Sequence, residues 1–97
     1  MDDVTAESKL SLAYDSLREI LEALSLENGY KIYNHECYTA FLKEILKESG
    51  KGDDFDDIRK IRNAINYYGK EVSVEEAETI IKKILLLRNS VINLLKT

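Results

Sequence analysis

The sequence predicts an all-α fold, an up-and-down bundle of four helices that forms one domain over residues 1–97. Proline is absent and only four glycines occur, whereas β-sandwiches and barrels need many turn residues. Apolar residues recur at spacings of three and four, which is the period of an amphipathic helix. Short connections of about four to six residues favour antiparallel neighbours. No segment approaches 18 consecutive apolar residues, so we expect no membrane-spanning helix.

The first helix is expected over about residues 3–27. Thr5 or Asp3 can cap its start, and Asn28 and Gly29 end it because both tolerate the left-handed conformation that closes a helix. Its apolar stripe contains Leu10, Ala13, Tyr14, Leu17, Ile20, Leu21 and Leu24.

The second helix is expected over about residues 34–49, with Asn34 as its N-cap. The glycines of the segment 50–52 are expected to break the chain after it. One side of this helix carries the stripe His35, Tyr38, Phe41, Leu42, Ile45 and Leu46.

The third helix is expected over about residues 54–68 and stops at Gly69. Its start carries four carboxylates, which suit the positive end of a helix dipole: Asp53, Asp54, Asp56 and Asp57. Its buried face contains Phe55, Ile58, Ile61 and Ile65.

The fourth helix is expected over about residues 73–96, with Ser73 and Glu76 as a capping box. Apolar residues cover well over half of its circumference, more than one neighbouring layer needs. Either this helix is central to the bundle or its spare face packs against another chain, and we predict a homodimer. Arg88 interrupts the apolar stripe, either as a stem whose head reaches solvent or as a member of a buried ion pair.

Composition indicates a cytoplasmic protein. The lone Cys37 cannot form an internal disulfide, and the acidic start at Met1–Asp3 has no apolar run behind it, unlike a secretory signal. The net charge of −4 is not that of an obvious nucleic-acid binder. We predict no cofactor and no metal site, because His35 and Cys37 point to different sides of a helix and the aspartate cluster lacks EF-hand spacing.

One face of the third helix gathers polar side chains. Its members are Arg59, Arg62, Asn63, Asn66 and Tyr67, at i, i+3, i+4, i+7 and i+8. Arginine offers a planar fork for phosphate, and asparagine and tyrosine add donors and an aromatic surface for a base. The spacing is also compatible with an ordinary solvated helix face.

The segment 62–69, which reads RNAINYYG, resembles the signature helix of the HEPN superfamily, the higher eukaryotes and prokaryotes nucleotide-binding domains. The segment 29–36 (GYKIYNHE), the segment 13–17 (AYDSL) and the pair Ala23 and Leu24 are similar to archaeal and bacterial members. The resemblance implies a small helical bundle that dimerises, with a nucleotide, RNA or protein partner. It also implies pairing with a small nucleotidyltransferase, as in toxin–antitoxin systems.

Ribonucleases of this family carry an Arg, then a polar residue, and a His five positions after the Arg, at a dimer cleft. By position, Arg62 matches the Arg, Asn63 the polar neighbour and Tyr67 the His. A phenol is almost fully protonated at neutral pH and is a poor general base. The departure therefore indicates a HEPN-like binding module that has lost ribonuclease chemistry.

His35, the only histidine, is either a neutral side chain hydrogen-bonded to the backbone or to a tyrosine, or a catalytic substitute close to Arg62. Three functions therefore stay open. The first is a dimeric non-catalytic binding module, the second a metal-independent ribonuclease that uses Arg62, and the third an oligomerisation bundle without a ligand.

Overall fold

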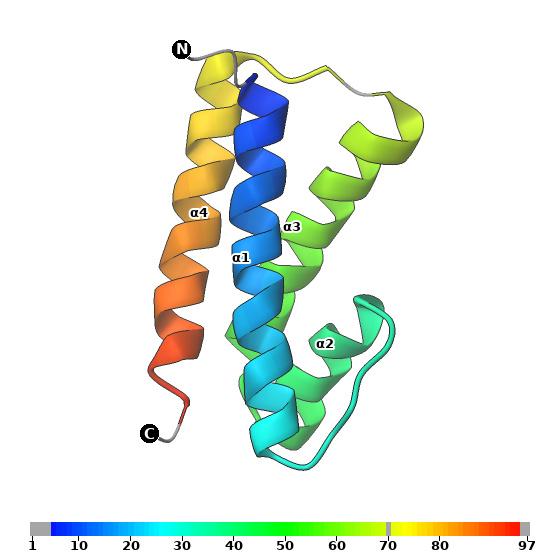
Figure 1. The fold of residues 1–97 in the computed structure, drawn as a ribbon, viewed down its shortest axis with the longest axis vertical. Coiled ribbons are helices and arrows are strands. Elements are labelled where there is room, and N and C mark those ends of the chain that lie inside the picture. Colours follow the sequence, from blue (N-terminus) through cyan, green and yellow to red (C-terminus); the bar gives the residue numbers. More distant parts are fainter. Residues whose placement is uncertain (1–4, 70, 96–97) are drawn as a thin grey trace.

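The computed structural model describes residues 5–69 and 71–95 of the chain. They form α1 (Ala6–Glu27), α2 (Glu36–Ala40), the π-helical turn η1 (Phe41–Ile45), α3 (Ser49–Tyr68) and α4 (Val74–Ile92), shown in Figure 1. No strand occurs in these residues, so the predicted all-α fold with four helices is confirmed. Within the same residues, no helix combines the length and the apolar character needed to cross a lipid bilayer.

The predicted caps of the first helix and the predicted stop of the third helix are confirmed. The Thr5 hydroxyl accepts a hydrogen bond from the Ser8 amide at 3.0 Å, and the other candidate cap, Asp3, lies outside the described residues. Gly29 and Gly69 have φ angles of 86° and 68°, which close α1 and α3 in the left-handed conformation.

The predicted capping box of the fourth helix is also confirmed. The Glu76 amide donates to the Ser73 hydroxyl, and the Ser73 amide donates to the Glu76 carboxylate, both at 3.1 Å. α4 ends at Ile92, and the predicted end near Lys96 lies outside the described residues.

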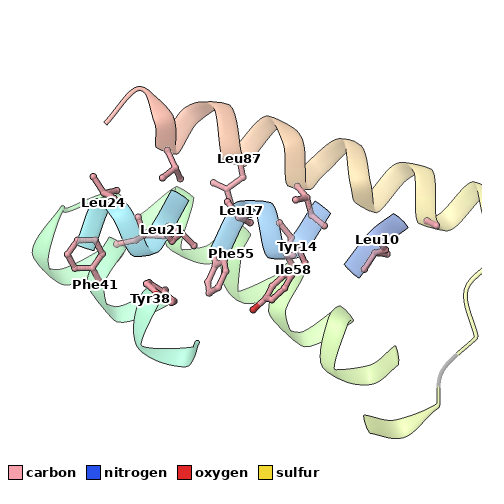
Figure 2. Packing of buried hydrophobic residues seen from close by; sticks show 14 residues of the cluster. Leu10, Tyr14, Leu17, Leu21, Leu24, Tyr38, Phe41, Phe55, Ile58 and Leu87 are labelled. Carbon is pink, nitrogen blue, oxygen red and sulfur yellow. The ribbon is translucent and has the colours of Figure 1, made fainter. Parts of the chain in front are cut away.

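The core lies where α1 meets the other helices, and Figure 2 shows its packing. The leucines of the predicted α1 stripe are buried, and so is Tyr14, whose ring stacks on that of Phe55 with centroids 6.0 Å apart. The buried apolar residues are Leu10, Tyr14, Leu17, Leu21, Leu24, Tyr38, Phe41, Leu42, Phe55, Ile58, Ala77, Ile84, Leu87 and Val91. Helical periodicity therefore identified the α1 face that organises the bundle.

The direction of α2 differs from the expected antiparallel order. The connection over residues 28–35 is longer than expected and carries no helix, and it leads the chain back along α1. His35 consequently contacts Tyr14 at mid-helix, whereas Phe41 lies against Tyr30, just beyond the end of α1. α1 and α2 therefore run in the same direction, and α3 runs opposite to both (Figure 1).

The second helix begins and ends differently from the prediction. α2 begins at Glu36 with His35 in the cap position and no side-chain cap, so the prediction of Asn34 as N-cap is wrong. The helix widens into η1, where the Leu46 amide donates to the Phe41 carbonyl at 3.1 Å. Lys47 then adopts a φ of 60°, which reverses the chain before position 49.

The predicted break at residues 50–52 is also wrong, because α3 starts at Ser49 and includes both glycines. Gly52 is buried at the contact between α3 and the segment 36–45. A Cβ atom there would collide with the Lys43 side chain and lie 3.2 Å from the Thr39 carbonyl oxygen. Gly52 therefore permits close helix packing instead of ending a helix.

Two aspartates of α3 bind other elements, which corrects their predicted place at the positive end of the helix dipole. They lie beyond the first turn of α3, which holds no acidic residue. Asp53 pairs with Lys43 of η1 at 2.6 Å, and Asp57 pairs with Lys83 of α4 at 3.7 Å. These carboxylates thus join α3 to two neighbours.

α4 lies at one edge of the bundle and packs chiefly against α1, so it is not the central helix (Figure 1). Its apolar surface is only partly covered, since Val74, Leu85 and Leu86 are 63%, 45% and 64% exposed. Arg88 is half-buried, its Nε atom has no hydrogen-bond partner, and it forms no ion pair with carboxylates in the described part of the chain.

We expect alanine substitutions at the two glycines of α3 to have opposite effects. Gly50→Ala meets open space and should raise the free energy of unfolding by about 0.5–1 kcal/mol, because alanine restricts the unfolded chain. Gly52→Ala should leave the protein at least about 1 kcal/mol less stable than Gly50→Ala, because Lys43 and the Thr39 carbonyl must move. Urea denaturation followed by circular dichroism measures both, and equal stabilities would contradict the packing role of Gly52.

Candidate functional site

A groove of about 430 Å³ lies between the start of α2 and the second half of α3. The residues that line it come from two segments far apart in the sequence, and they are Asn34, His35, Glu36, Arg59, Arg62, Asn63 and Tyr67. The reversed course of residues 28–35 creates this groove, because it places the start of α2 beside Arg59 and Arg62.

The groove brings together every predicted site residue except Asn66. That residue lines a separate hollow between α3 and the start of α1, together with Thr5 and Leu12. Asn34 and Glu36 line the groove although the sequence did not suggest them for the site. The only feature of the sequence that could have predicted them is that they are adjacent to His35. This adjacency becomes informative once the structure shows that α2 faces α3.

Arg59 is neutralised by carboxylates and ties α2 to α3. Its Nη2 atom donates to Asp56 Oδ1 at 2.8 Å, and its Nη1 atom lies 3.9 Å from Glu36 Oε2 on α2. The hydrogen bond from Arg59, followed by that from Lys60, lowers the pKa of Asp56 below its usual 3.8. Arg59 therefore contributes more to the packing of the groove than to its net charge.

Arg62 is the cation of the groove that lacks a carboxylate partner. Its guanidinium carbon lies 5.1 Å from the centre of the Tyr14 ring, in a cation–π contact. In the described part of the chain it forms no ion pair, and its Nε atom is buried without a hydrogen-bond partner. An anion in the groove would meet an arginine that no carboxylate of residues 5–69 and 71–95 compensates.

Tyr14 lies beneath the groove and links it to the core. Its hydroxyl lies 3.0 Å from His35 Nδ1, within hydrogen-bond distance, and its side chain is fully buried. Burial raises the pKa of Tyr14 from 10.0 to about 12. No signal in the sequence marks Tyr14 as functional, because a tyrosine within a leucine stripe is typical of a core residue.

His35 combines the two arrangements that the sequence left open. It is hydrogen-bonded to a tyrosine, and it lines the same groove as Arg62. Burial, followed by the positive charges of Arg18 and Arg62, lowers the pKa of His35 below 6.5. These surroundings favour the neutral imidazole.

Tyr67 borders the groove with 70% of its surface exposed. Its ring is open to stacking by a planar ligand, and its hydroxyl can donate a hydrogen bond. Among the described residues, no three His, Cys, Asp or Glu side chains come together as a metal site would require.

Comparison with known proteins gives no relative from which a function could be transferred. No protein-family model, no curated protein and no solved structure matches the chain. The chemistry of the groove therefore has to be argued from its own side chains.

We expect Tyr14→Phe to lower the free energy of unfolding at pH 8 by about 1 kcal/mol, because His35 Nδ1 loses its hydrogen-bond partner. The raised pKa gives a second signature. The unfolded state loses the Tyr14 proton near pH 10 and the folded state only near pH 12. The stability that this proton contributes therefore disappears between pH 10 and 12, and the advantage of the wild type over Tyr14→Phe shrinks there.

Urea denaturation at pH 8 and pH 11 measures both effects. Tyr67→Phe is the matched control, since it removes an exposed hydroxyl and should leave the free energy of unfolding unchanged. Equal losses for the two variants at pH 8 would show that the Tyr14–His35 hydrogen bond does not stabilise the fold.

Proposed function

We propose that the chain is a HEPN-like module that binds a nucleotide or RNA through a phosphate in the groove between α2 and α3, without cleaving it. The observation that carries this proposal is the uncompensated charge of Arg62 in a groove with other hydrogen-bond donors. A guanidinium matches phosphate oxygens with paired donors, and the amides of Asn34 and Asn63 add further donors. The exposed ring of Tyr67 offers a surface for a base.

The net negative charge of the protein indicates that phosphate would bind at one local site and not over a broad basic surface. The protein carries a net charge of −4, so its overall charge repels a polyanion. Binding through one compensated and one uncompensated arginine predicts few phosphate contacts and a shallow dependence on salt. A mononucleotide or a short single strand fits this arrangement better than a duplex.

The absence of cleavage is proposed from Tyr67, which occupies the position of the family's histidine. A phenol keeps its proton at neutral pH, so it can donate to a phosphate but does not exchange protons as imidazole does. A bound phosphodiester would then be held without a general base at this position.

A metal-independent ribonuclease is the second candidate, and one specific observation favours it. His35 lines the same groove as Arg62, although it comes from another helix than the family motif. An imidazole beside an arginine could act on a phosphodiester as an acid or a base. RNA cleavage that requires both residues would support this candidate over the binding module.

The proposed module is a homodimer, and α4 provides the surface for it. Val74, Ile81, Leu85 and Ile92 recur at intervals of seven, four and seven, which places them on one face of α4. Val74 and Leu85 are exposed there, Ile81 and Ile92 are half-buried, and an apolar helix face left partly exposed is typical of interfaces. A nucleotidyltransferase as protein partner is supported by the HEPN resemblance alone.

We expect a short fluorescein-labelled single-stranded RNA to bind the wild type at about 50 mM salt, and Arg62→Gln to weaken its binding at least about tenfold. Lys82→Gln removes the same charge from the exposed face of α4 and should leave the affinity unchanged. Fluorescence anisotropy gives the affinities, and circular dichroism checks that each variant is folded.

Equal affinities for wild type, Arg62→Gln and Lys82→Gln would contradict the proposal, and so would an absence of binding. Gel analysis of the same mixtures tests for cleavage. Products that form with the wild type but not with Arg62→Ala or His35→Ala would replace the binding module by the ribonuclease.

We expect light scattering at tens of micromolar to give the mass of a dimer for the wild type. Leu85→Glu should give the mass of a monomer, because it places a charge within the proposed interface. The control Leu12→Glu alters a 65% exposed leucine of α1 and should remain dimeric. A monomeric wild type would refute the dimer.

A further inference from the structure

The charges around His35 favour its neutral form, and an anion in the groove would favour its protonated form. Arg59 and Arg62 line the groove beside it, and the positive charge of Arg18 on α1 also acts on it. The negative groups that face it are few, and they are Asp15 of α1 and Glu36, the first residue of α2. Since Glu36 and Asp56 already compensate Arg59, the unliganded surroundings of His35 are positive and disfavour the imidazolium.

A phosphodiester bound at Arg62 would reverse this balance. It brings a full negative charge into the groove that His35 also lines. An opposite charge within about 4–6 Å favours the charged form of a side chain by 1–3 pKa units. The imidazolium can in addition donate a charge-assisted hydrogen bond to a phosphate oxygen.

We propose that His35 is the proton-binding residue of the groove, and that a phosphodiester held by Arg62 is bound together with one proton on the His35 imidazole. The inference rests on the proposed phosphate site and names the residue that makes its affinity depend on pH. No bond of the ligand is broken, and the proton comes from solvent and returns there when the anion leaves.

Tyr14 is the positioning residue for this change, because a hydroxyl can serve both protonation states of His35. It can donate to an unprotonated Nδ1 of the neutral ring, and after rotation of its O–H bond it can accept from Nδ1–H of the imidazolium. The same ring carries the guanidinium of Arg62 on its face. One buried side chain thus holds both groups that would contact the anion.

Proton NMR tests the inference directly, because His35 is the only histidine and its ring protons give one assignable set of signals. The probe is the dinucleotide uridylyl-3′,5′-uridine, whose phosphodiester keeps its charge throughout the range from pH 5 to 8. We expect the free protein to titrate below the ordinary pKa of 6.5, and the pKa of His35 to rise by at least about 1 with the probe at saturation.

If binding of the probe raises the pKa of His35, thermodynamic linkage requires the affinity for the probe to depend on pH through the same protonation. The probe should bind close to tenfold more tightly at pH 5 than at pH 8 if the pKa of His35 rises by about 1 on binding. His35→Gln should bind the probe with an affinity that no longer depends on pH. Tyr14→Phe should show a smaller rise of the His35 pKa on binding, whereas Lys82→Gln should match the wild type.

The outcomes separate this inference from the function on which it rests. Saturable binding that needs Arg62 but leaves the pKa of His35 unchanged would overturn the role of His35 and leave the phosphate site intact. Absence of probe binding at both pH 5 and pH 8 would overturn both. A rise of the His35 pKa that persists in Arg62→Gln would place the anion elsewhere and also overturn the inference.

Discussion

The buried contacts of Tyr14 are the constraint on which the arrangement of this molecule depends. Its ring stacks on Phe55 of α3, its hydroxyl meets His35 at the start of α2, and its face carries the Arg62 guanidinium. One side chain of α1 thereby fixes the position of α2 relative to α3. The groove lies between α2 and α3, so its geometry depends on the core residue Tyr14 as well as on the residues that line it.

The two arginines of the groove, Arg59 and Arg62, have different roles because their neighbours differ. They lie three residues apart on α3 and both line the groove. Arg59 is engaged by Asp56 and by Glu36 of the neighbouring helix, whereas Arg62 lies over the Tyr14 ring and pairs with no carboxylate of the described residues. Paired charges contribute to orientation and little to external potential, so the capacity to attract an anion resides mainly in Arg62.

The extent of α1 and the caps of α1 and α4 could be predicted because those signals are local. The apolar period of α1 and the capping box of Ser73 and Glu76 each depend on residues within one or two turns. Gly52 could not be interpreted in this way, since its role is a close approach to Lys43 and Thr39 of another element. The lining of the groove was predictable in part, because helical spacing places Arg59, Arg62, Asn63 and Tyr67 on one face of α3. That Asn66 lines another hollow, and that Asn34 and Glu36 line the groove, follows from tertiary packing.

The length of the connection over residues 28–35 sets the position of His35 in the groove. It crosses the stretch of α1 from Glu27 back to Tyr14, which is about 20 Å of helix. An extended chain spans at most about 3.3 Å per residue, so the segment has little slack to lose. Surface loops usually accept insertions and deletions at small cost. Here a deletion of more than about two residues would leave the segment too short for that span and withdraw His35 from Tyr14. The length of this loop therefore determines the site together with the residues that line it.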